Sequence, residues 1–347
     1  MSNTFETYLN KFNENDWLGA IETLAPEIHE VDRAATGVWF RFFPLGLFRY
    51  LQSAEDKEKA VQSLVIKGDY ELKNQIDTSH HFLYGHRYWK TVKAAIEAES
   101  AVFENGDIDL AEEIRQIAQL AAEKLKADTS LVLGITAVGF MTVVQAGLEN
   151  FKNASGEVEK PQGLMAKTAN QIVKERAKDD SQGLFGFLKT IDKKFTVNYT
   201  TPKFEGKFGV IYDEEIASAS AKDQSKDWKA ADDRCWEGVV PVECRSAACG
   251  TCWVGVLDGE EKLSEVERLE RTRMEIFGYH QPEDEKPFLR LACQAKAYGN
   301  VSIVIPPWNG TFGREVYGVE HVDLEPATTS AKQTRTIVKE AVKNQLM

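Results

Sequence analysis

The chain has 347 residues, of which 54 are acidic and 42 are lysine or arginine, so its formal net charge is −12. This length predicts about two domains, at roughly 100–200 residues each. A surface this acidic repels phosphate backbones, so we expect no nucleic acid among the partners. It suits docking on a basic protein surface, or it only keeps the protein soluble.

The N-terminus and the cysteines bear on the compartment. The first residues, MSNTFETYLNKFNENDW, are polar and acidic, so no secretory signal is expected. Four of the five cysteines crowd between 235 and 252. That spacing favours a metal site in a reducing compartment over a disulfide framework, and it predicts a cytoplasmic protein.

The first 190 residues or so have the pattern of a mostly helical domain. Apolar residues recur at helical spacing in LAEEIRQIAQLAAEKLKA, with Asp107 or Asp109 as the cap. A second helix is expected to start at Ser53 and to be interrupted by Gly68, and a third is expected around 164–177. The apolar stretch 131–146 is shorter than the roughly 20 residues of a membrane span, so we expect a buried helix.

Two further parts of this half contain chemically versatile side chains. His80, His81 and His86 lack the i, i+4 spacing that two ligands on one helical face need, so packing is favoured over metal or haem ligation. The aromatic segment 36–51 with its interleaved arginines is expected in the core or at a subunit interface, because the acidic chain disfavours base stacking.

The chain changes character near residues 180–192. β-branched and aromatic residues then alternate with polar ones on either side of a Pro202–Gly206 break, which predicts a hairpin. We therefore expect a helical partner-docking domain over 1–190, an α+β arrangement with a second domain over 191–315, and a tail over 316–347 with a short amphipathic helix.

The segment CRSAACGTC, residues 244–252, contains the strongest motif. Cys244, Cys249 and Cys252 follow the spacing C-x4-C-x2-C, and Cys293 is the only later cysteine. The residues between them are small, so backbone N–H groups can approach sulfur closely and offset the negative charge of thiolates. A zinc site remains an alternative, although it usually shows two C-x2-C pairs, and four unconnected core thiols are another.

Together with the GVVPVEC approach (238–244) and the later LACQAKAYGNVSIVIP segment, this motif resembles the plant-type 2Fe-2S ferredoxin family over about residues 195–308. The resemblance implies a β-grasp ferredoxin-like fold, a 2Fe-2S cluster and a role in electron transport. It implies these cluster ligands: Cys244, Cys249, Cys252 and Cys293. It implies these further cluster-binding residues: Arg245, Ser246, Ala248, Gly250 and Thr251.

The sequence departs from the family pattern in two places. Ala247 stands where the family usually has glycine, so a positive φ there would be strained. The 40 residues between Cys252 and Cys293 exceed the gap in small ferredoxins and are expected to hold an extra helix from Ser264. Cys235 has no place in the motif and is expected to be a buried thiol on a helix before the loop.

No G-x-G-x-x-G follows a strand and no phosphate loop is present, so no catalytic residues are expected. We predict an electron carrier that exchanges single electrons with a redox partner protein, without a membrane. Acidic residues after the loop are candidates for steering that docking: Asp258, Glu265, Glu267 and Glu270. The alternatives are an iron–sulfur subunit of a hydrogenase, dehydrogenase or oxygenase system, and a redox sensor.

Overall fold

The computed structural model describes residues 4–104, 108–177, 193–279 and 287–319. The chain divides into two compact units. The helical unit contains residues up to 53 and residues 69–177, and the sheet unit contains 54–68 and the described residues from 193 onward. The short segment 54–68 therefore belongs with the C-terminal half, although the sequence suggested that it was part of the N-terminal domain.

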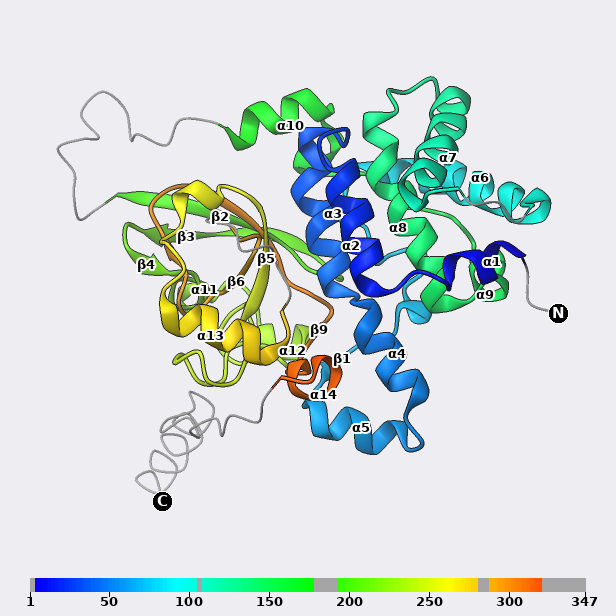
Figure 1. The fold of residues 1–347 in the computed structure, drawn as a ribbon. Coiled ribbons are helices and arrows are strands. Elements are labelled where there is room, and N and C mark those ends of the chain that lie inside the picture. The colour runs from blue at the N-terminus through cyan, green and yellow to red at the C-terminus, as the bar shows by residue number, and fades with distance from the viewer. Residues whose placement is uncertain (1–3, 105–107, 178–192, 280–286, 320–347) are drawn as a thin grey trace, which may run out of the picture. The chain divides into compact units, whose positions relative to one another are not determined.

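The helical unit is built from helices throughout (Figure 1). Its α-helices are α1 (Thr4–Leu9), α2 (Glu14–Leu24), α3 (Glu30–Phe42), α4 (Leu45–Ser53), α6 (Trp89–Val102), α7 (Leu110–Leu125), α8 (Ser130–Ala146), α9 (Leu148–Asn153) and α10 (Ala169–Arg176). The predicted helical character of this half is confirmed.

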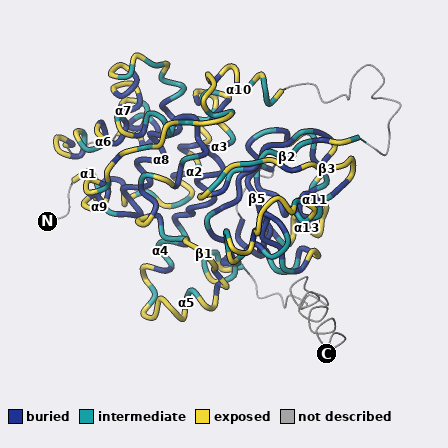
Figure 2. The backbone as a smooth tube through the Cα atoms, turned by 180° about the vertical axis from the view of Figure 1, so that it is seen from behind, coloured by how far each residue is buried: buried dark blue, intermediate teal, exposed yellow. Residues whose placement is uncertain are grey.

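Helix α8 forms the centre of the helical unit. It is buried at every position from Val132 to Ala146, and Figure 2 shows it in dark blue between partly exposed helices. Helix α7 packs against it, and the side chain of Asp109 caps α7 by accepting from the N–H of Ala111 at 3.0 Å. Among the described residues, no helix combines the length and apolarity that crossing a membrane requires.

Two predicted helix starts were wrong. Ser53 is the last residue of α4, and helix α5 (Lys57–Leu64) begins after Asp56, whose carboxylate accepts the N–H of Lys59 at 3.0 Å. Asp56 is the better cap because its carboxylate reaches the third helical N–H. The helix expected from 164 starts only at Ala169, because Thr168 and Gln171 form a capping box there.

Two of the three clustered histidines pack inside the helical unit. His80 is fully buried, and its Nδ1 lies 2.8 Å from Nδ1 of His86 while its Nε2 lies 3.2 Å from the carbonyl of Ile76. Because a carbonyl only accepts, Nε2 of His80 donates to Ile76, and His86 donates to His80. This pattern requires a neutral His80 ring, and burial, which lowers the pKa of His86, favours the neutral form of that ring as well.

We expect acid to weaken this histidine pair. Burial lowers the pKa of His86 from 6.5 to about 4 and that of His80 well below its usual value. The unfolded chain then binds protons first, so this contribution to stability is complete above pH 6.5 and is lost as the pH falls toward 4. The difference in unfolding free energy between the natural chain and His86→Phe should shrink over that window. A difference independent of pH would contradict the neutral pair.

The sheet unit combines a mixed sheet with several helices (Figure 1). Its helices are α5, α11 (Ile216–Lys222), α12 (Trp228–Ala231), α13 (Arg268–Phe277) and α14 (Gly313–Tyr317). Its strands are β1 (Lys67–Gly68), β2 (Lys194–Thr200), β3 (Glu205–Ile211), β4 (Glu214–Glu215), β5 (Trp253–Asp258), β6 (Leu289–Leu291), β7 (Lys296–Ala297), β8 (Val301–Val304) and β9 (Trp308–Asn309).

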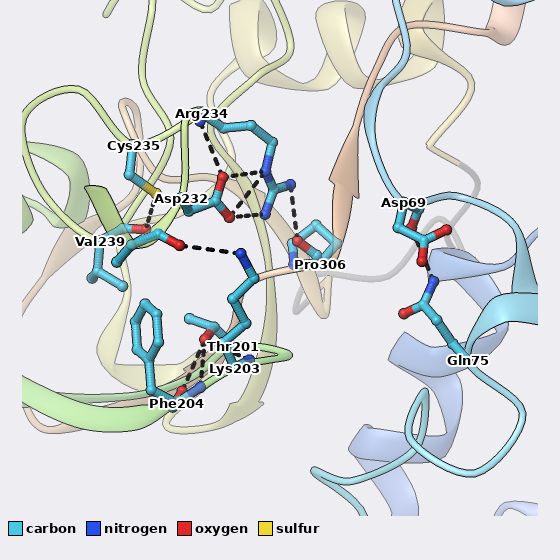
Figure 3. Close-up of polar contacts among 11 residues, drawn as sticks. Asp69, Gln75, Thr201, Lys203, Phe204, Asp232, Arg234, Cys235, Val239 and Pro306 are labelled. Atoms are coloured by element: carbon cyan, nitrogen blue, oxygen red, sulfur yellow. Dashed lines mark hydrogen bonds and ion pairs between the residues drawn. The ribbon is translucent and has the colours of Figure 1, made fainter. Parts of the chain in front are cut away.

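The main sheet has the strand order β3-β2-β8-β5-β6, and β2 and β8 run parallel while the other neighbours are antiparallel. The predicted hairpin is confirmed as β2 and β3. At its turn the Thr201 hydroxyl oxygen accepts the N–H groups of Lys203 and Phe204 (Figure 3). Helix α11 packs on β3, and the fold class predicted from the sequence, α+β, is confirmed.

Some expectations fall outside the described residues. They include the change between domains expected near residue 190 and nearly all of the tail over 316–347 with its amphipathic helix. The extra helix expected from Ser264 is present as α13, and it begins at Arg268.

Candidate metal centre

The register of two strands brings the late cysteine to the early ones. Cys252 directly precedes β5, and Cys293 follows β6 after Ala292. Trp253 pairs with Leu291 in the antiparallel ladder, and the N–H of Ala292 donates to the carbonyl of Cys252 at 3.0 Å. This pairing places Cys293 next to Cys252, the C-terminal residue of the loop 244–252.

The four thiols influence one another in two pairs. The neighbouring Cys249 thiol lowers the pKa of Cys244, and the neighbouring Cys252 thiol lowers the pKa of Cys293. The pKa values of Cys249 and Cys252 are raised by the same neighbours and by burial. In the described part of the chain, no three His, Cys, Asp or Glu side chains gather as a single metal ion would need. Four cysteines are the number of thiolate ligands that a 2Fe-2S cluster needs.

Hydrogen-bond donors point at these sulfurs. The N–H groups of Ser246 and Ala248 lie 3.4 and 3.3 Å from Sγ of Cys244. The Thr251 hydroxyl lies 3.1 Å from Sγ of Cys249, and the Gln294 amide lies 3.4 Å from Sγ of Cys293. Donors of this kind stabilise the negative charge of thiolates in a largely buried site.

The loop depends on left-handed backbone at three positions. Arg245, Ala247 and Gly250 have φ values of 61°, 56° and 68°. Glycine adopts this conformation freely, whereas alanine is strained in it. The strain anticipated for a positive φ at Ala247 is therefore present, and the fully buried methyl group partly offsets it.

We expect Ala247→Gly to leave the stability of the unit within about 1 kcal/mol of the natural chain. Relief of backbone strain is worth roughly 1 kcal/mol, and loss of a buried methyl group costs about 0.8 kcal/mol. Ala247→Val adds β-branching at a buried left-handed position and should abolish retention of the metal centre. Equal metal content in the alanine and valine proteins would show that this backbone conformation is unnecessary.

Arg245 and the acidic residues expected to steer docking differ in what their side chains contact. The guanidinium of Arg245 is exposed and binds Ser218 Oγ at 2.9 Å and the carboxylate of Glu237, so this side chain fixes the loop to neighbouring residues. Glu265 and Glu267 are exposed, as docking would require. Glu270 is only 1% exposed and is paired with Arg290, so the idea that it steers a partner was wrong.

Cys235 lies in the loop after α12, so the expected helical location was wrong. Helix α12 ends at Ala231 because Asp232 adopts extended backbone. The Cys235 thiol is buried and donates to the carbonyl of Val239 at 3.2 Å (Figure 3), and burial raises its pKa to about 12. It is therefore a protonated core thiol at neutral pH.

Two residues of this environment were missed in the sequence. Gln294 follows the last cysteine directly, and its adjacency was the available signal. Tyr279 is buried, and its hydroxyl lies 2.8 Å from the Gly250 carbonyl and 2.6 Å from the Gly310 carbonyl. Tyr279 stands 27 residues beyond Cys252 in the sequence, so no local motif could reveal it.

Comparison with known proteins agrees with this geometry. Residues 219–298 match the family described as the 2Fe-2S iron-sulfur cluster binding domain, whereas the N-terminal part matches no family. No curated protein matches the chain. The matched range includes the loop, Cys244, Cys249, Cys252, Cys293 and strands β5 and β6. Residues 219–298 are therefore a ferredoxin-type 2Fe-2S domain, which binds a 2Fe-2S cluster and serves electron transfer.

Proposed function

We propose that Cys244 and Cys249 bind one iron of the cluster and that Cys252 and Cys293 bind the other. The observation that carries this assignment is the β5–β6 register, which places Cys293 beside Cys252 and leaves Cys244 and Cys249 as the two remaining ligands within the loop. The lowered pKa values of Cys244 and Cys293 favour the thiolate form that a metal ligand needs. Cys235 is excluded from the ligand set because its thiol is protonated and bound to Val239.

The cluster supplies a centre that holds one additional electron. The residues of the chain determine how easily that electron is accommodated. N–H donors at Cys244, the Thr251 hydroxyl and the Gln294 amide stabilise added negative charge at the sulfurs. Cys244, Cys252 and Cys293 are buried, whereas Cys249 is partly exposed, so we infer that electrons pass on the Cys249 side.

We propose that the protein passes single electrons to or from a partner oxidoreductase in the cytoplasm. The five free cysteines suit a reducing compartment, and the charge of −12 suits a basic partner surface. The helical unit would then select or dock the partner. It has its own buried core around α8 and lies outside the matched range, so cluster binding does not account for it.

The test of this function uses the natural full-length chain, purified without oxygen. We expect two irons and two sulfides per chain and, after reduction with dithionite, a single rhombic S = 1/2 electron paramagnetic resonance signal. Electron transfer to a basic acceptor such as cytochrome c should slow as ionic strength rises, because salt screens the attraction. A protein that contains zinc and gives no such signal would overturn the proposal.

A permanent iron–sulfur subunit of a larger oxidoreductase is the second candidate. The separate helical unit favours it, because a free carrier needs little beyond the domain that holds its cluster. Native mass measured after gentle purification from its source separates the two. A stable complex with other subunits supports the second candidate, and a free monomer supports a mobile carrier.

A further inference from the structure

The segment Ala54–Gly68 comes from the N-terminal half of the chain but belongs to the sheet unit. The chain leaves the helical unit after Ser53 and returns to it at Asp69. Between these points lie α5 and the two-residue strand β1. The segment lies far outside the family match at 219–298, so an ordinary domain of this family does not account for it.

The segment is attached to the C-terminal part of the sheet unit by main-chain contacts. Strand β1 pairs antiparallel with β9, so Gly68 faces Trp308. The carbonyl of Leu64 accepts the N–H of Thr311 at 3.1 Å and its hydroxyl at 3.3 Å. A methyl group on Gly68 would lie 2.4 Å from the carbonyl oxygen of Pro307, so this contact requires a glycine.

Arg234 also contributes to the attachment of strand β1 to residues 306–308. Its guanidinium is buried, binds both carboxylate oxygens of Asp232 and donates to the carbonyl of Pro306 at 3.1 Å (Figure 3). A methyl group on Gly68 would also come within 3.4 Å of the Arg234 side chain. Strand β1 is therefore packed closely between Arg234 and residues 307–308.

Three connections lead from this attachment to the cluster loop. Gly310 packs on Ile66, and its carbonyl shares the buried Tyr279 hydroxyl with the carbonyl of Gly250. The methyl group of Thr311 lies close to Gly250, because a Cβ added to Gly250 would be 3.0 Å from Cγ2 of Thr311. Lys67 forms an ion pair with Glu243 at 2.5 Å, and Glu243 directly precedes Cys244.

We propose that residues 54–68 form a strap that completes the cluster domain and positions its loop, with Gly68 and Lys67 as positioning residues. The inference rests on the cysteine assignment proposed above. It makes a segment from the N-terminal half of the chain, residues 54–68, a structural requirement for cluster retention. The sheet unit holds the loop tightly only while the strap contacts residues 307–311 and Arg234.

The first test is Gly68→Ala in the full-length chain. We expect iron release to a chelator to become about tenfold faster, because the added methyl group displaces β1 from Pro307. Gly318→Ala is the matched control, since Gly318 also has a positive φ, 64°, but has open space around it. Gly209→Ala controls for alanine substitution in a strand of the same unit. Both control proteins should release iron at the natural rate.

The second test uses the charge of Lys67, which is exposed enough that its replacement should not unfold the unit. Lys67→Met removes a cation beside the residue preceding Cys244, so the reduction potential should fall and iron release should accelerate about twofold. Lys67→Arg keeps the positive charge, so its reduction potential and its rate of iron release should equal those of the natural chain. A merely structural strap would leave the potential unchanged.

The outcomes separate the two proposals. If the natural chain lacks a 2Fe-2S signal, the cysteine assignment fails before the strap is tested. If the natural chain holds the cluster but Gly68→Ala releases iron no faster than Gly318→Ala, the strap is overturned. Should Gly68→Ala fail to fold, the potential of Lys67→Met decides, and an unchanged potential with an unchanged release rate overturns the proposal.

Discussion

Cys249→Ala should lose the cluster, leaving less than about a tenth of the iron found in the natural protein. Under the ligand assignment proposed above, the substitution leaves one iron with Cys244 as its single cysteine ligand. Alanine is preferred to serine because a serine oxygen can replace the missing ligand. The measurement is iron and sulfide per chain, together with the visible absorption and the electron paramagnetic resonance signal of the reduced protein.

The matched control for this result is Cys235→Ala. Cys235 is more deeply buried than Cys249, so its loss disturbs packing at least as much. We expect this protein to keep two irons and the natural signal. Loss of the cluster from both variants would show general unfolding, and retention of a normal cluster by Cys249→Ala would refute the ligand assignment.

Glu270→Gln should destabilise the sheet unit by about 3–5 kcal/mol, because it leaves a buried arginine without its counter-charge. Arg290 and Glu270 are 3% and 1% exposed at their side chains, and two contacts of 2.9 Å join them. The carboxylate also accepts the N–H of Leu291 at 2.9 Å. The pair therefore fixes α13 to β6, the strand that leads to Cys293.

The free energy of unfolding is measured from chemical denaturation followed by circular dichroism. Asp213→Asn is the control, because Asp213 pairs with Lys296 at 3.6 Å on the surface and the pair is worth no more than about 1 kcal/mol. Glu270→Gln should also lose iron faster than the natural chain. If it unfolds at the same denaturant concentration as the control, the buried pair does not hold the unit together.

Local spacing in the sequence was enough to identify most of the site. Cys244, Cys249 and Cys252 lie within one nine-residue loop, so their separation along the chain limits their separation in space. The loop is short and its residues are small, so the sequence also predicted that backbone N–H groups would approach the sulfurs. The N–H of Ala248, which donates to Sγ of Cys244, is an example. Helical periodicity predicted α7 for the same reason, because it depends on neighbours within a few residues, whereas α8 was predicted from its continuous apolar run.

Contacts between distant segments were decided only by the tertiary structure. Glu270 was interpreted as a surface carboxylate, because no motif near it in the sequence indicates its ion pair with Arg290, 20 residues later. The strap 54–68 looked like part of a helical domain, and its pairing with β9 depends on residues about 240 positions later. Such contacts depend on strand register and packing, which the local pattern of side chains does not encode.

The four cysteines show most clearly which features the sequence determines and which only the tertiary structure decides. The sequence by itself determined which residues carry the thiols and that three of them share a loop. Only the β5–β6 register decides that Cys293 pairs with Cys252, and only the folded backbone places Ala247 in a strained left-handed conformation. The physical reason is that ligand chemistry is a property of single residues, whereas ligand pairing is a property of strands that meet after folding.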